Sequence, residues 1–129
     1  MGTLGGLKLG RWCGVTVAFP ALVLMVGVVA AEAKSPAYVG KWATTAAQCR
    51  LPSSDINAPI VMTRRTYDQF ESHCDLSNIV GGKRIWTAKS RCVTNGDVSR
   101  PRLTIFATAK GLSLKWSNQQ FPDNNVRCR

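Results

Sequence analysis

Residues 102–116 read RLTIFATAKGLSLKW, and this stretch decides the fold class of the chain. In residues 112–116 an apolar side chain stands at every second position, with serine and lysine between. Arg102–Ala107 follows the same alternation, except that the apolar Phe106 stands at a position where a polar residue is expected. Because successive side chains of a β-strand point to opposite faces, both halves are typical of strands with one buried face. Lys110-Gly111 between them predicts a turn, so we expect a β-hairpin.

The same alternation recurs upstream, which places this hairpin in a longer antiparallel meander. Residues 84–92 put every second side chain on one face, and Asn95-Gly96 behind them is a strong hairpin signal. Further strands are predicted at residues 60–63 and 67–74. About six to eight short strands in one sheet predict an all-β domain, a small antiparallel barrel or curved sheet.

Two segments show no alternation. Residues 46–59 and 118–125 are rich in proline, serine, aspartate and asparagine, which favour turns. We expect the first segment to be a loop with at most one helical turn. The second is expected to be a loop that leads into a short tail carrying Cys128. Both loops are candidate surfaces for a partner.

The first 33 residues have the three-part organisation of a secretory signal peptide. Lys8 and Arg11 come first without an acid, an apolar run follows over residues 15–31, and small residues end the segment. An uncleaved membrane anchor is the alternative, because the apolar run approaches the roughly 20 residues that span a bilayer. We favour the signal peptide, and therefore an exported protein.

Small residues place the cleavage after Ala31 or after Ala33, and we favour the second position. The mature chain is then residues 34–129, a single small β domain with no transmembrane span. A domain of this size has a thin apolar core, so we expect additional covalent stabilisation.

Four cysteines remain after cleavage, Cys49, Cys74, Cys92 and Cys128. An even number of cysteines in an exported chain predicts two disulfides, which three different pairings would satisfy. We favour Cys49 with Cys74 and Cys92 with Cys128. A structural zinc site is the alternative, but the chain has no C-x-x-C pair. No metal is therefore expected.

The chain is strongly basic, with 17 lysines and arginines against 7 acidic residues. Such a charge attracts anionic lipid, polysaccharide or nucleic acid. In an exported protein we expect these charges to be solvated on the outer face of the sheet. Contact with an anionic envelope surface is the alternative, and nucleic acid is not expected. Basic residues that alternate with aromatic ones are the candidates for that contact: Arg64, Arg65, Lys83, Arg84, Lys89 and Arg91.

Residues for catalysis are scarce. His73 is the only histidine, and its neighbour Cys74 points to the opposite face of the predicted strand. Asp68 and Glu71 lie three apart on the same predicted strand, so they also face opposite ways. The chain has no P-loop, calcium loop, nucleophile elbow or dinucleotide-binding fingerprint. We therefore expect no enzyme and no cofactor.

Gly40-Lys41-Trp42 resembles the G-x-W start of lipocalin-like barrels. The resemblance implies that Trp42 closes one end of the barrel and that Arg127 or Arg129 stacks on it. A cation over an aromatic ring contributes about 0.5 to 2 kcal/mol. The expected structural aromatic residues are Trp42, Trp86 and Trp116.

From Gly40 to Cys128 the chain is similar to a group of small exported bacterial domains of unknown function. The shared features are a G-x-W-A opening, a C-x-x-x-G turn from Cys92 to Gly96, and an Arg-Cys ending. This resemblance implies a periplasmic location and two disulfides, and it implies no activity.

Together these features predict a non-enzymatic binding module of the periplasm or the secreted fraction. Its partner is expected to be an exported protein or an anionic envelope polymer. One alternative is an inhibitor of an exported hydrolase such as a protease. Another is an envelope-associated protein held by anionic lipid or polysaccharide. The sequence does not indicate the oligomeric state.

Overall fold

The structure, a computed structural model, describes Gly2, Gly14, Gly27 and residues 33–129. The predicted signal peptide lies almost wholly outside the described residues. Ala33–Arg129 forms one compact unit. It contains nine strands and the short 3-10 helix η1 (Ala46–Arg50). The strands are β1 (Gly40–Ala43), β2 (Ile60–Met62), β3 (Thr66–Gln69), β4 (Ser72–Gly82), β5 (Ile85–Thr94), β6 (Asp97–Ser99), β7 (Arg102–Ala107), β8 (Gly111–Trp116) and β9 (Asp123–Arg127).

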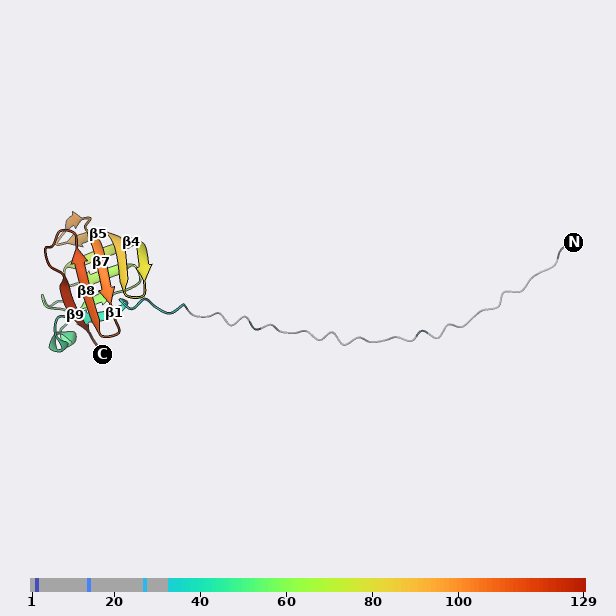
Figure 1. Ribbon diagram of the computed structural model, residues 1–129, viewed down its shortest axis with the longest axis horizontal. Helices are drawn as coiled ribbons and strands as arrows, with labels where there is room; N and C mark the ends of the chain where they lie inside the picture. The colour runs from blue at the N-terminus through green and yellow to red at the C-terminus, as the bar shows by residue number, and fades with distance from the viewer. Residues whose placement is uncertain (1, 3–13, 15–26, 28–32) are drawn as a thin grey trace. The chain divides into compact units, whose positions relative to one another are not determined.

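The strands form a closed antiparallel barrel of eight strands (Figure 1). The order around the ring is β4-β3-β2-β1-β9-β8-β7-β5, and β5 pairs again with β4. The short strand β6 adds to β5 outside this ring. The predicted all-β class is therefore confirmed, and the barrel is the form that the meander takes.

The hairpin predicted over residues 102–116 is confirmed as β7 and β8. Leu103 pairs with Trp116, and Ala107 pairs with Leu112. Every second residue is buried in β7 and β8, and the exception in the pattern, Phe106, lies outside at 42% exposure. The predicted strand at 84–92 is likewise confirmed within β5, with its alternating burial.

The predicted loop at residues 118–125 is partly wrong, because its end begins strand β9. β9 pairs with β8 on one side and with β1 on the other. Aspartate and asparagine are depleted in strands, so the sequence DNNVR gave no strand signal. Barrel closure supplies hydrogen-bond partners on both edges of this segment, and that outweighs the low propensity of its residues.

The single strand predicted at residues 67–74 is also wrong, because the chain turns in its middle. Phe70 has φ 44 and connects β3 to β4, whose residues Gln69 and Ser72 are register partners. One continuous strand over residues 67–74 would put Phe70 and Cys74 on the same face, but Phe70 is exposed and Cys74 is buried. The turn was missed because Phe70 is bulky and lacks the usual chemistry of a residue with positive φ.

One end of the barrel is closed by the arginine stack that the lipocalin-like resemblance implied. The guanidinium carbon of Arg127 lies 4.2 Å from the ring centroid of Trp42, which is fully buried. Arg127 also donates to the carbonyl oxygens of Ala37, Val39 and Ala109 at 2.7, 3.3 and 2.9 Å. One side chain therefore holds the strand β9, the segment before β1 and the β7–β8 turn together.

Gly40 explains why glycine begins the G-x-W sequence. Its φ of 148 lies in the region that favours glycine, and a Cβ there would stand 2.6 Å from Nη1 of Arg127. Tyr38 completes this closed end: its hydroxyl donates to the carbonyl of Arg64 at 3.0 Å, and its ring meets Trp86 edge-on at 5.1 Å. The interior behind it is filled by buried apolar side chains.

The disulfides are Cys49–Cys128 and Cys74–Cys92, so the favoured pairing is wrong. Cys74 and Cys92 are register partners on β4 and β5, which puts their Cα atoms 4.0 Å apart. Cys49 on η1 is joined to Cys128, which follows β9. The sequence could not select this pairing, because it depends on the extension of β4 past Cys74 to pair with β5, and on the closure by β9.

Loss of the two disulfides is expected to cost different amounts of stability. Cys49–Cys128 spans 79 residues and Cys74–Cys92 spans 18. Because a longer loop loses more entropy when it is closed, removal by paired Cys→Ala changes is expected to cost about 4.5 and about 3 kcal/mol respectively. Urea unfolding of the two double variants checks this order. The reverse order would show that native-state packing, and not chain entropy, sets the difference.

Candidate binding site

The other end of the barrel opens into a shallow depression, here called the mouth, of about 270 Å³. It is contributed by the β3–β4 hairpin, the end of β5, β6 and the loop between β8 and β9. The disulfide Cys74–Cys92 forms part of its wall. The other lining residues are Tyr67, Gln69, Ser72, Thr94, Ser99, Pro101, Trp116, Asn118, Gln119 and Asp123.

Two aromatic rings stand at the base of the mouth. Tyr67 and Trp116 meet edge-on at 5.2 Å between ring centroids, and each is 7% exposed. The Tyr67 hydroxyl donates to Oε1 of Gln69 at 2.7 Å, and Nε2 of Gln69 donates to the carbonyl of Ala58 at 3.2 Å. Burial, and then the charge of Asp123, raise the pKa of Tyr67, so the phenol stays neutral.

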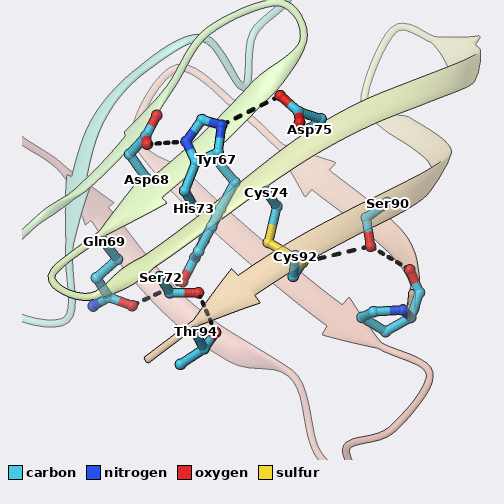
Figure 2. The surroundings of a disulfide bond; sticks show 11 residues. Tyr67, Asp68, Gln69, Ser72, His73, Cys74, Asp75, Ser90, Cys92 and Thr94 are labelled. Carbon is cyan, nitrogen blue, oxygen red and sulfur yellow. Dashed lines mark hydrogen bonds and ion pairs between the residues drawn. A yellow bond between two sulfur atoms is a disulfide. The ribbon is translucent and has the colours of Figure 1, made fainter. Parts of the chain in front are cut away.

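The mouth also carries hydroxyl groups. Ser72 and Thr94 are register partners, and their hydroxyl oxygens lie 2.9 Å apart (Figure 2). Asn118 and Gln119 are exposed on the β8–β9 loop. The mouth thus offers hydroxyl and amide groups around two aromatic rings. Such a surface can hold a small polar group by hydrogen bonds and ring contacts.

The two loops that were expected to contact a partner, residues 46–59 and 118–125, do not lie at the same site. Part of 118–125 rims the mouth, as expected for a contact surface. Residues 46–59 contribute no lining side chain to the mouth, because η1 is fastened to Cys128 by its disulfide. Within that segment, Ala58 approaches the mouth only through the carbonyl that accepts from Gln69.

His73 lies on the outer face of the barrel, with a carboxylate on each side. Asp68 is its register partner on β3 and Asp75 is two residues further along β4, so all three side chains point outward (Figure 2). Nδ1 of His73 contacts Asp68, and Nε2 lies 3.2 Å from Asp75. The sequence did not indicate this cluster, because it did not indicate the turn at Phe70 that pairs β3 with β4. The His73–Asp75 spacing was the only signal for it.

The hydrogen bond to Asp68 is the main cause of a raised pKa at His73, and Asp75 adds to it. A raised pKa means that the proton binds more tightly to the folded state. The resulting stabilisation is full below the unfolded pKa of about 6.5 and is lost as the pH rises through the folded pKa. His73 is half exposed, so the contribution is reduced by solvent screening.

We predict that the NMR titration of the single histidine has its midpoint above about 6.5. Asp68→Asn removes the nearer carboxylate and is expected to lower that midpoint. Asp97→Asn, at the start of β6, is the control and should leave it unchanged. A wild-type midpoint at or below the ordinary histidine pKa of about 6.5 would show that the two carboxylates do not stabilise the protonated ring.

The six predicted basic residues are all exposed, but they form separate groups. Four lie in turns at the closed end: Arg64 and Arg65 between β2 and β3, Lys83 and Arg84 between β4 and β5. Two lie on the outer face of β5: Lys89 and Arg91.

Sequence reasoning did not find that Arg102 on β7 is the register partner of Lys89. In the part of the chain that the structure describes, the only ion pairs are those of His73. These lysines and arginines therefore have no carboxylate partner within that part.

Comparisons with family models, with curated proteins and with solved structures gave no match to this chain. The class that fold and site define is thus a small disulfide-bonded all-β barrel, compatible with a lipocalin-like fold. Over the described residues, no helix is long and apolar enough for a membrane crossing. The two intramolecular disulfides are consistent with an oxidising, exported location.

Proposed function

We propose that this protein is a non-enzymatic binding module of the periplasm or the secreted fraction, and that it binds its partner at the mouth of the barrel. The observation that supports this most is the lining of the mouth, where two aromatic rings lie beside hydroxyl and amide groups. Depressions of about 670 and about 740 Å³ also border Arg127 at the closed end, but their lining is mainly alanine, valine and basic side chains.

The size of the mouth argues for a macromolecular partner. Sites for small molecules usually enclose about 300 to 1,000 Å³, and the mouth measures about 270 Å³ and is open to solvent. The barrel interior is filled with side chains, which leaves no room for an enclosed apolar ligand. One protruding polar group of a protein or a polysaccharide fits this volume.

The proposal of an exported protein has three supports. The N-terminal residues have the pattern of a signal peptide, the four mature cysteines form two disulfides, and the chain resembles small exported bacterial domains of unknown function. The mouth offers hydrogen-bonding groups and no nucleophile next to a base, which favours binding over catalysis. An exported protease inhibited by a contact with the mouth is one partner of this kind.

Asn118→Trp is the variant that tests the mouth, because it fills the depression from an exposed loop position. Asn124→Trp is its matched control, because Asn124 is exposed on β9 and does not line the mouth. Each protein is immobilised and presented with the protein fraction and the polysaccharide fraction of the exported compartment. We expect wild type and Asn124→Trp to retain the same species, and Asn118→Trp to retain at least about tenfold less.

Equal retention by both variants would show that the mouth is not the binding site. Recovery of no specific species from either fraction would contradict a binding role.

A further inference from the structure

The β4–β5 hairpin carries an exposed patch that the mouth does not use. This hairpin patch consists of Val80, Lys83, Arg84, Ile85 and Phe106. Val80, Ile85 and Phe106 are 67%, 53% and 42% exposed. Ile85 is the register partner of Phe106 on β7, and Lys83 and Arg84 form the turn directly before it. The three apolar residues therefore lie beside two cations on one continuous surface.

The charge around the hairpin patch has a single sign. The turns at this closed end of the barrel, residues 63–65, 83–84 and 108–110, contain lysines and arginines and no aspartate or glutamate. Along β4, the carboxylate nearest to Val80 is Asp75, five residues earlier, and it contacts His73. Since no ion pair involves a lysine or arginine within the described residues, the positive field of the patch is uncompensated.

We infer that the hairpin patch docks the protein on an anionic lipid bilayer. Lys83 and Arg84 contact lipid phosphates, and the apolar side chains enter the boundary between headgroups and acyl chains. The apolar residues favour lipid over an anionic polysaccharide, because a hydrated polymer offers them no apolar phase. Exposed apolar side chains that cluster together mark interaction surfaces, whereas scattered ones need no explanation.

This docking is compatible with the proposed binding at the mouth and does not depend on it. Ser72 and Thr94, which line the mouth, pair at one end of the β4–β5 hairpin. Lys83 and Arg84 form the turn at its other end. A molecule held by the hairpin patch therefore keeps its mouth free for a partner.

Vesicle co-sedimentation tests the cations of the hairpin patch. The processed protein, purified from the exported fraction, is mixed with phosphatidylcholine vesicles with and without phosphatidylglycerol. We expect binding only to the anionic vesicles. Lys83→Gln/Arg84→Gln is expected to weaken it about thirtyfold. The control Arg100→Gln/Arg102→Gln removes the same charge at the start of β7 and is expected to weaken it less than about threefold.

A second pair of variants tests the apolar part. Phe106→Ser is expected to weaken vesicle binding about tenfold, and Ile85→Ser to do the same. The control Phe121→Ser changes a phenylalanine that is 71% exposed in the β8–β9 loop, and it should have no effect. Binding to dextran sulfate, which offers charge alone, should be insensitive to Phe106→Ser. All substituted positions are exposed, and circular dichroism verifies that each variant is folded.

Three results would overturn the inference. The first is absence of binding to the anionic vesicles. The second is an equal loss for Lys83→Gln/Arg84→Gln and Arg100→Gln/Arg102→Gln, which would show that net charge alone acts. The third is unchanged vesicle binding by both Phe106→Ser and Ile85→Ser, which would leave a charge-held surface without lipid preference.

Discussion

Closure of the barrel by β9 is the constraint on which the rest of the structure depends. β9 is the last strand of the chain, and it fills the gap between β1 and β8. Its residue Arg127 stacks on Trp42 and donates to three carbonyl groups. The next residue, Cys128, is joined to η1 by a disulfide. Without β9 two strand edges would be unpaired, which is costly and invites aggregation.

The closing strand also explains how a polar sequence lies inside a barrel. Asp123, Asn125 and Arg127 share one face of β9: Asp123 is exposed, Asn125 is buried and Arg127 is half-buried. Arg127 is satisfied by carbonyl groups, and Asp123 lines the mouth. Asn125 is buried, and its Nδ2 has no partner among the described residues. An unsatisfied buried donor costs about 1 to 3 kcal/mol, so Asn125 stabilises β9 less than an apolar side chain at that position would.

Most of the fold could be predicted from the period of two in the sequence. That period located β5, β7 and β8. The G-x-W sequence indicated that Arg127 or Arg129 stacks on Trp42, and the residue that does so is Arg127. The failures have one physical origin. Phe70 adopts a positive φ and β9 is rich in asparagine, so local propensity pointed away from the turn and the strand that tertiary pairing imposes.

The errors in the candidate sites followed from those two misplaced segments. The disulfide pairing needed the register of Cys74 with Cys92, and the His73 cluster needed the register with Asp68. The first register is set by the β4–β5 hairpin, whose turn is Lys83 and Arg84, and the second by the turn at Phe70. The exposed basic residues could be named from composition. Their division between the closed end and the outer face of β5 could not, because it depends on which turns lie at the same end of the barrel.

Nuclear Overhauser contacts between β1 and β9, measured with amide hydrogen exchange, test barrel closure most directly. A closed barrel predicts cross-strand contacts for the pairs Trp42 with Arg127 and Ala43 with Val126, and slow exchange of the Arg127 amide, which donates to the carbonyl of Lys110. Rapid exchange of the β9 amides together with absence of these contacts would show an open sheet, and would contradict the closure of the barrel.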